Sequence, residues 1–247
     1  MRTLFISTVA SAALLMSSCA QAKQTTELSK SEIEQIVKDY LIANPEVIVE
    51  AMEALQQKEQ LAEVEKTRNA IKSAKDALIN DPRDVSIGPK DAKVTIVEFF
   101  DYNCGYCKRA TPWVEDILEK HKGDVRIIFK ELPILESRTK TSRPAAKAAL
   151  AAARQGKYSA MHFALMKEKR LTADSIRNVA ERVGLNMKKF DADMADPSIE
   201  THIDDTLNLA TRLPALTGTP FFVINEDYVS GADTRRLEQL LDAALAG

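Results

Sequence analysis

Two cysteines, Cys104 and Cys107, are three positions apart, directly after an apolar segment and directly before a helix-favouring segment. A sulfur at the start of a helix faces unpaired backbone N–H groups and the positive end of the helix dipole, and both favour a thiolate. We therefore expect Cys104 to have a lowered pKa and to act as a nucleophile. Cys107, one turn further on, is then the shielded resolving thiol. The spacing predicts thiol-disulfide exchange.

Other uses of a cysteine pair are weighed against this one. A structural zinc site needs four Cys or His ligands, and His121, His162 and His202 do not occur at paired spacing. A structural disulfide gains most by closing a long loop, and two intervening residues close a very short one. Copper(I) uptake by two soft thiolates remains an alternative from a different class. We assign no metal site and expect no cofactor.

A single carboxylate, Glu98, interrupts the apolar segment Val94–Phe100, which is β-branched and aromatic and predicts a buried strand. Burial of a carboxylate is costly and raises its pKa. Accepting the proton of Cys107 during exchange would give such a residue a purpose. The alternative is that Glu98 lies at a sheet edge or pairs with Lys130 on the neighbouring strand.

The elements around the dithiol predict an α/β fold. A strand, a helix and a second strand follow one another within a short span, which is typical of a βαβ unit with a parallel strand pair. A long helical stretch comes next, and the chain then returns to two short strands and a closing helix. The predicted ranges are 94–100, 105–121, 125–132, the helical insertion about 142–213, 221–225, 228–232 and 233–245.

The first 22 residues have the pattern of a signal peptide. Arg2 precedes an apolar run from Leu4 to Met16, and small residues follow, with cleavage expected after Ala22. The apolar run is too short to span a bilayer. A lipoprotein processed at Cys19 is the alternative. We predict an exported, periplasmic protein.

Residues 28–78 are predicted to be helical, with a cap at Ser29 or Ser31 and a break at Pro45. Apolar residues recur at helical spacing up to Leu55, and a charge-rich stretch follows. This apolar stripe either covers the protein's own catalytic domain or associates with copies of itself. We divide the chain into a signal peptide (1–22), a helical oligomerisation segment and linker (23–80) and a catalytic domain (81–247).

The bulk composition fits one large domain with an extension. The chain has 247 residues, of which 45% are hydrophobic, and its formal net charge is −2. Removal of the leader leaves a mildly acidic chain. Neither nucleic acid nor an anionic membrane surface is therefore an expected partner.

From about Val85 to its end, the chain resembles the DsbA-like branch of the thioredoxin superfamily. The resemblance implies a thioredoxin-like fold, with Cys104 and Cys107 as the redox pair and Glu98 as the buried acidic residue. It also implies that Thr219 and Pro220 form a cis-proline loop that presents backbone to a bound substrate. The helical segment "IVKDYLIANPEVIVEAMEALQQK" is similar to the oligomerising N-terminal region of ScsC-type proteins.

Departures from the DsbA pattern affect the predicted direction of the reaction. Gly105 and Tyr106 between the cysteines, with Thr219 before the proline, resemble the DsbC-type isomerases instead of the oxidase. We therefore predict an oligomeric disulfide isomerase or reductase that acts on protein clients containing cysteines and exchanges electrons with a membrane redox partner. A monomeric DsbA-like oxidase is the alternative.

Overall fold

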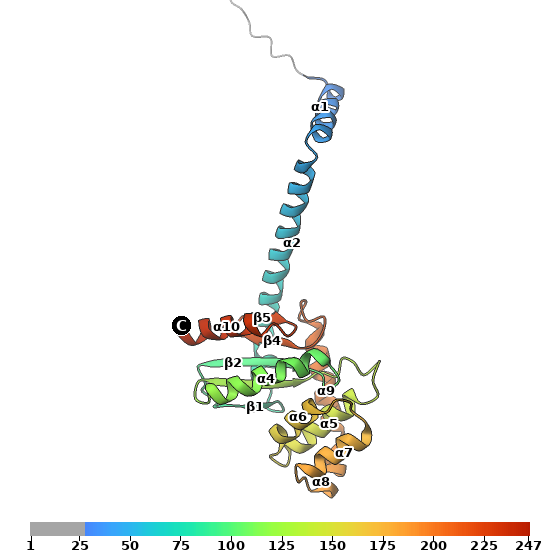
Figure 1. Cartoon of the computed structure of the whole chain (residues 1–247), viewed down its shortest axis with the longest axis vertical. Helices are drawn as coiled ribbons and strands as arrows, with labels where there is room; N and C mark the ends of the chain where they lie inside the picture. Colours follow the sequence, from blue (N-terminus) through green and yellow to red (C-terminus); the bar gives the residue numbers. More distant parts are fainter. Residues whose placement is uncertain (1–27) are drawn as a thin grey trace, which may run out of the picture. The chain divides into compact units, whose positions relative to one another are not determined.

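The computed structural model describes residues 28–247 (Figure 1). These residues belong to two compact units, one ending at Leu55 and the other running from Gln56 to Gly247. The predicted signal peptide and Cys19 lie outside the described residues. Among the helices of residues 28–247, none is both long enough and apolar enough to cross a membrane.

The described part of the N-terminal unit is helical, as predicted. Helix α1 (Lys30–Ala43) starts at a Ser29 cap that is completed by Glu32, and it ends at Asn44. Helix α2 (Glu46–Ser73) begins directly after Pro45, so the predicted break is confirmed. No residue of α1 is buried. The exposed large apolar residues in this unit are Leu28, Ile33, Ile36, Val37, Tyr40, Ile42, Ile48, Val49, Met52 and Leu55.

The second unit is built on a five-stranded sheet with the strand order β1-β3-β2-β4-β5. The central strands β2 and β3 run parallel, and the other neighbouring pairs are antiparallel. Strand β1 occupies a segment for which the sequence predicted no strand, because three residues are too few to show an alternating pattern. The strands are β1 (Val85–Ile87), β2 (Val94–Phe100), β3 (Val125–Glu131), β4 (Phe221–Ile224) and β5 (Asp227–Ser230).

The two faces of the sheet carry separate apolar clusters, since successive side chains of a strand point to opposite faces. Val94, Ile96 and Phe100 of β2 belong to the cluster that includes helices α4 (Gly105–Lys120) and α10 (Thr234–Ala246). Val97 and Phe99 belong to the cluster on the other face. The redox helix α4 therefore lies on the face to which the even-numbered residues of β2 point.

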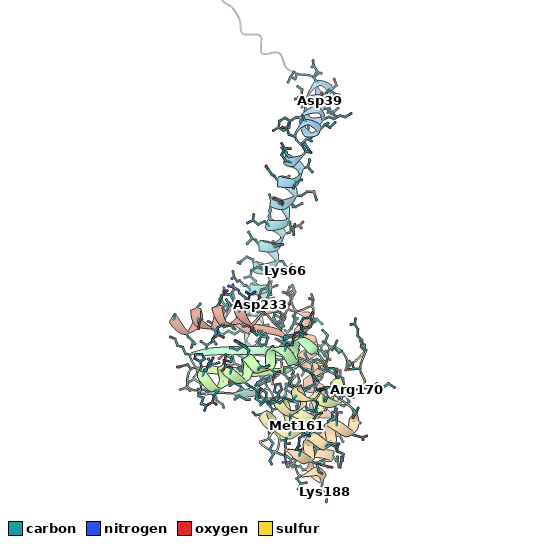
Figure 2. All side chains as sticks on the ribbon, in the orientation of Figure 1. Asp39, Lys66, Met161, Arg170, Lys188 and Asp233 are labelled. Carbon is teal, nitrogen blue, oxygen red and sulfur yellow. The ribbon has the colours of Figure 1, made fainter. Side chains whose placement is uncertain are left out.

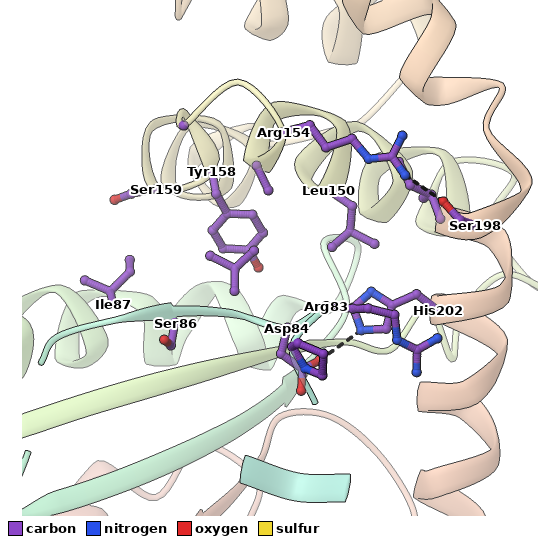
Figure 3. A pocket seen from close by; sticks show the side chains of 15 residues that line it. Arg83, Asp84, Ser86, Ile87, Leu150, Arg154, Tyr158, Ser159, Ser198 and His202 are labelled. Carbon is purple, nitrogen blue, oxygen red and sulfur yellow. Dashed lines mark hydrogen bonds and ion pairs between the residues drawn. The ribbon is translucent and has the colours of Figure 1, made fainter. Parts of the chain in front are cut away.

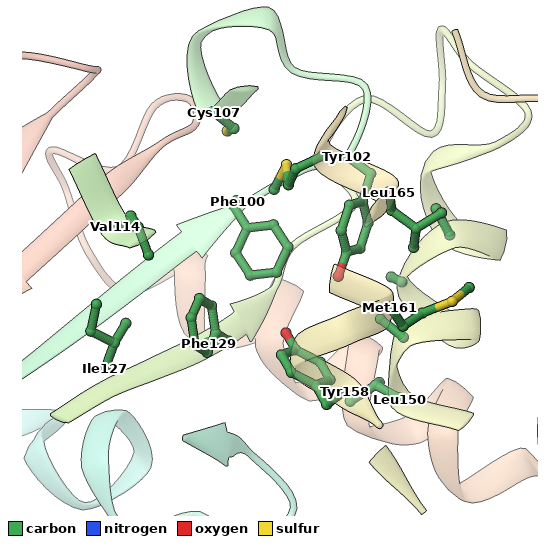
Figure 4. Close-up of a cluster of buried hydrophobic side chains, with 14 of the residues drawn as sticks. Phe100, Tyr102, Cys107, Val114, Ile127, Phe129, Leu150, Tyr158, Met161 and Leu165 are labelled. Atoms are coloured by element: carbon green, nitrogen blue, oxygen red, sulfur yellow. The ribbon is translucent and has the colours of Figure 1, made fainter. Parts of the chain in front are cut away.

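A helical insertion separates β3 from β4, as predicted. Alanine-rich α5 packs against α6, α7, α8 and α9, and aromatic rings from the sheet and the insertion meet in one cluster (Figure 4). Met161 is buried in the insertion, whereas Arg170 and Lys188 are exposed on its surface (Figure 2). The helices are α5 (Ser142–Ala153), α6 (Tyr158–Lys167), α7 (Ala173–Arg182), α8 (Met187–Met194) and α9 (Pro197–Thr211). This is a thioredoxin-like fold with a helical insertion, preceded by a helical extension.

Three apolar residues that precede β1 pack against the sheet. Ile71 and Ala74, near the end of α2, and Leu78 in α3 (Lys75–Ile79) are buried in the second cluster. The Lys130 ammonium donates to the Ala77 carbonyl at 2.6 Å, which ties α3 to the sheet. These residues lie within the compact unit that runs from Gln56 to Gly247. The sequence did not predict that these apolar residues are buried, because charged residues separate them.

Candidate redox site

Cys104 is the N-cap residue of α4, as its position in the sequence predicted. Its backbone is extended, and its sulfur accepts a hydrogen bond from the Cys107 backbone N–H at 3.4 Å. The unpaired N–H groups of the first turn therefore point toward this sulfur. Both Cys104 and Cys107 are free thiols.

The surroundings of Cys104 favour its ionised form. A hydrogen bond from the Cys107 side chain is the largest influence, and it outweighs the opposing effect of partial burial. Further hydrogen bonds come from the side chain of Thr219 and from the backbone of Cys107 and Tyr106. Together they lower the pKa of Cys104 from 9.0 to about 5. At neutral pH this sulfur is a thiolate.

Cys107 has the opposite character. Its side chain is fully buried, at 0% exposure, in the cluster between the sheet and α4 (Figure 4). Burial is the main reason that the pKa of Cys107 lies well above 9.0, and the hydrogen bond to Cys104 adds to the rise. The two sulfurs of one dithiol thus differ in both access and protonation.

The Thr219-Pro220 loop lies against Cys104, although it is distant in sequence. The peptide bond between Thr219 and Pro220 is cis. In its protonated form the Cys104 thiol donates to the Thr219 carbonyl at 3.1 Å. Pro220 is buried, and its carbonyl accepts from the Gly231 N–H at 2.8 Å. The structure therefore brings together the dithiol and the loop that the sequence had singled out.

Glu98 is 1% exposed and points to the same face of the sheet as α4. Its Oε2 is buried and has no hydrogen-bond partner among the described residues. Burial raises the pKa of Glu98 to about 8. The alternative pairing with Lys130 is wrong, because Lys130 faces the other side of the sheet and pairs there with Asp84.

Gly105 and Tyr106 leave open space beside the reactive sulfur. A side-chain carbon added to Gly105 would meet no atom within 4 Å. Tyr106 is 59% exposed, and the Arg109 guanidinium lies 3.9 Å from the centre of its ring. This cation–π contact leaves the edge of the ring and the charged group accessible on one surface.

A polar network behind the dithiol was not predicted from the sequence. Buried Glu131 accepts hydrogen bonds from Tyr102 at 3.0 Å and from Tyr158 at 2.8 Å. The His162 Nδ1 contacts the Tyr102 hydroxyl at 3.0 Å, and burial lowers the pKa of His162 to about 3. His162 is therefore a neutral core residue. The sequence feature that could have indicated this network is Glu131, a carboxylate at the end of the predicted strand 125–132.

A separate cavity of about 640 Å³ lies between β1 and the helical insertion (Figure 3). Neither cysteine lines it. At one end of it, His202 and Asp84 are joined by a 3.0 Å contact, and with Asp81 they form the one metal-capable group among residues 28–247. Lys130 already pairs with Asp84, and Arg83 already pairs with Asp81. These cations neutralise the carboxylates that a metal ion would need.

The fold and the unequal dithiol define the class of thioredoxin-fold thiol-disulfide oxidoreductases. Comparison with family models gives two matches: the DSBA-like thioredoxin domain over residues 95–244 and the copper resistance protein ScsC N-terminal domain over residues 30–62. The chain belongs to the DsbA-like thioredoxin family, and it carries an ScsC-type N-terminal region.

Solved structures agree with this assignment. A linker-deletion mutant of Proteus mirabilis ScsC is 31% identical, with a TM-score of 0.66, and the match covers 90% of this chain and 99% of that chain. The thiol-disulfide exchange protein α-DsbA2 of Wolbachia pipientis is 28% identical, with a TM-score of 0.67, and the match covers 74% of this chain and 97% of that chain.

Curated relatives share only part of their length with this chain. The protein named Na(+)/H(+) antiporter NhaA 3 of Salinispora tropica is 34% identical over 149 residues, which make up 60% of this chain and 22% of the antiporter. The corresponding protein of Herminiimonas arsenicoxydans is 29% identical over 161 residues, or 65% of this chain and 25% of the antiporter. The chain therefore spans about a quarter of the length of these relatives.

Proposed function

We propose that this protein catalyses thiol-disulfide exchange with protein clients, with Cys104 as the attacking sulfur and Cys107 as the resolving sulfur. The observation that carries the proposal is the contrast between the two groups. The pKa of Cys104 is lowered to about 5, whereas the pKa of Cys107 is raised by burial. Only Cys104 is ionised at neutral pH, and it keeps 7% exposure whereas Cys107 has none, so the order of attack is fixed.

The proposed reaction has two steps. The Cys104 thiolate attacks one sulfur of a client disulfide, so that a mixed disulfide forms and the other client sulfur leaves as a thiolate. In the second step Cys107 loses its proton and attacks Cys104, which releases the first client sulfur, oxidises the protein pair and reduces the client. If a client thiol attacks instead, the client disulfide is rearranged and the protein dithiol is regenerated.

Glu98 is the proposed acceptor for the Cys107 proton. It is buried on the face of the sheet that carries α4, with one carboxylate oxygen free of partners. Its negative charge is among the influences that raise the pKa of Cys107, which supports proximity of the two groups. A pKa of about 8 is close to the working pH, as efficient proton exchange requires.

Client segments are proposed to bind beside the Cys104 sulfur. The Thr219-Pro220 loop would offer backbone groups to an extended client chain. Gly105 adds no side chain that would block the approach, and the exposed Tyr106 would give an apolar contact. These four residues form the proposed substrate surface.

The proposed direction is isomerisation or reduction, by an exported oligomer. The exposed apolar residues between Leu28 and Leu55 require a cover, and the ScsC-type match over residues 30–62 supports association between copies. Several dithiols held in one assembly could act on one misfolded client while shielded from an oxidase. We propose a periplasmic location and a membrane protein that keeps the dithiol reduced.

Reactivation of scrambled ribonuclease tests this direction. The reduced protein is expected to restore ribonuclease activity, and the oxidised protein is expected to be a poor donor of disulfides to reduced ribonuclease. Rapid disulfide donation without reactivation of the scrambled form would favour the alternative, a monomeric DsbA-like oxidase.

A copper-tolerance role is the second candidate, because the N-terminal match is described as a copper resistance domain. Cys104 and Cys107 offer two soft sulfur ligands for copper(I). Titration of the reduced protein with copper(I) under a competing chelator tests this role. Uptake of one equivalent, lost in Cys107→Ser, with no ribonuclease reactivation would favour the copper role over exchange.

A further inference from the structure

Ser142 is the first residue of the helical insertion, and its hydroxyl is not used to cap its own helix. The N-cap residue of α5 is Thr141, whose side chain makes no capping hydrogen bond. Ser142 is 1% exposed. Its Oγ donates to the Asp101 Oδ1 at 2.8 Å and accepts from the Asn103 Nδ2 at 3.0 Å. A buried serine therefore joins the insertion to the segment directly before Cys104.

Asp101 organises that segment. Its carboxylate accepts hydrogen bonds from the Asn103 backbone N–H at 2.7 Å and from the Leu135 backbone N–H at 2.9 Å. Its own carbonyl accepts from the Cys104 N–H at 3.0 Å. A side chain that bonds the backbone two residues on fixes a turn. Asp101, itself 2% exposed, thus sets the path of the chain into Cys104.

Asn103 strengthens the same connection. Its amide nitrogen lies 3.0 to 3.2 Å from three hydroxyl oxygens, those of Thr139, Thr141 and Ser142. Asn103 directly precedes Cys104. Asp101 and Asn103, which flank Tyr102, are both tied to the end of the β3–α5 connection. Among residues 28–247, Ser142 is the one that bonds the side chains of both Asp101 and Asn103.

The network also reaches the second sulfur. The Asp101 backbone is among the influences that lower the pKa of Cys107, although burial outweighs it. The Cys107 N–H in turn bonds the Cys104 sulfur. Movement of the Asp101–Cys104 segment would change the hydrogen bonds of both sulfurs.

We propose that Ser142 is a positioning residue for the dithiol: through Asp101 and Asn103 it fixes the backbone that presents Cys104 to the first turn of α4. The helical insertion thereby helps to determine the reactivity of the redox pair. This inference rests on the proposed exchange function, because it assigns Ser142 a part in that reaction.

The substitution Ser142→Ala tests the inference, because it removes one oxygen and no charge. The loosened segment is expected to weaken the hydrogen bonds to the Cys104 sulfur, so the pKa of Cys104 measured by thiolate absorbance should rise by about half a unit to one unit. The fraction of oxidised dithiol in a glutathione buffer should rise as the thiolate loses stability. Asn103→Ala should shift both quantities in the same direction, and it serves as the test if Ser142→Ala does not fold.

Ser175→Ala is the matched control. Ser175 also lies in the insertion, where its hydroxyl completes the cap of α7 with Thr172. Its loss should lower stability without moving the pKa of Cys104. An unchanged pKa in folded Ser142→Ala and Asn103→Ala, or an equal shift in Ser175→Ala, would overturn the inference. Failure of the proposed exchange function would appear differently, as wild-type protein that does not exchange with disulfides.

Discussion

The two compact units of this chain differ in how far their apolar side chains are exposed. In the sheet unit, both faces of the sheet are covered by helices of the same chain, and residues such as Ile71 and Leu78 are buried. In the described part of the N-terminal unit, ten large apolar residues are between 45 and 69% exposed. Large apolar patches are rarely left exposed on monomeric proteins. The difference supports the proposal that the N-terminal helices associate with copies of the chain, while the sheet unit buries its own apolar residues.

The largest expected effect comes from replacing the cysteines of the sheet unit, which tests its chemistry independently of the N-terminal unit. Cys104→Ser should abolish exchange with any disulfide, since the fully buried Cys107, whose pKa is raised, cannot replace the Cys104 thiolate. Cys107→Ser should still attack and should accumulate the mixed disulfide with its client. Mass spectrometry after mixing with a disulfide peptide distinguishes the two variants. A Cys104→Ser protein that keeps measurable exchange would remove the assigned nucleophile.

Removing the N-terminal unit tests the other half of the comparison. A chain that begins at Gln56 retains every buried residue of the second apolar cluster. It is expected to fold as a monomer by light scattering, to lose most of its ribonuclease reactivation and to keep its rate of attack on a small disulfide. If the full-length protein already has the mass of a monomer, the oligomer proposal fails and the oxidase alternative gains.

Glu98 gives the sheet unit a pH-dependent stability. Burial raises the pKa of Glu98 from 4.5 in the unfolded chain to about 8 in the folded protein. The neutral carboxyl therefore contributes its full stability below the unfolded-state pKa, and this contribution is lost as the pH rises through the folded-state pKa. The resulting loss in the free energy of unfolding is roughly 3 to 5 kcal/mol. Glu98→Gln cannot ionise, so it should remove most of this decline.

Denaturant unfolding at several pH values, followed by the fluorescence of Trp113, measures this effect in the sheet unit. Trp113 is the single tryptophan of the chain and packs against Phe222. Equal slopes of stability against pH in Glu98→Gln and in the wild type would show that Glu98 is not the titrating group.

A pair of truncations compares buried and exposed positions directly. Leu78→Ala should lower the free energy of unfolding by about 2 to 4 kcal/mol, because it leaves a cavity in the second cluster. Ile36→Ala removes a side chain that is 54% exposed, so it should change the Trp113 unfolding transition by less than about 0.5 kcal/mol. A similar loss in both variants would mean that the N-terminal helices stabilise the sheet unit of their own chain.

Strong local patterns made much of this architecture predictable. The apolar segments that became β2 and β3, the dithiol at the start of α4 and the proline before β4 each combine residue types with one preferred backbone role. The break at Pro45 and the Ser29 cap follow in the same way from local chemistry. These features depend on residues that are neighbours in the sequence, so one sequence is enough to predict them.

The features that the sequence did not show depend on distant contacts. Strand β1 is recognisable only from its pairing with β3, and Leu78 only from the sheet against which it packs. Ser142 looks like an ordinary residue at the start of a helix until the fold brings it to Asp101. Glu98 was predicted to be buried, but the face to which it points required the strand register.

The central claim is that the Cys104 sulfur is ionised at neutral pH because, at the start of α4, it accepts hydrogen bonds from Cys107 and from the backbone of the first turn. Titration of the reduced protein by ultraviolet thiolate absorbance, with Cys104→Ser as the reference, tests this claim most directly. The account predicts one thiol with a pKa of about 5, absent from Cys104→Ser. A first thiol that ionises only near the pKa of free cysteine, about 8.5, would contradict it.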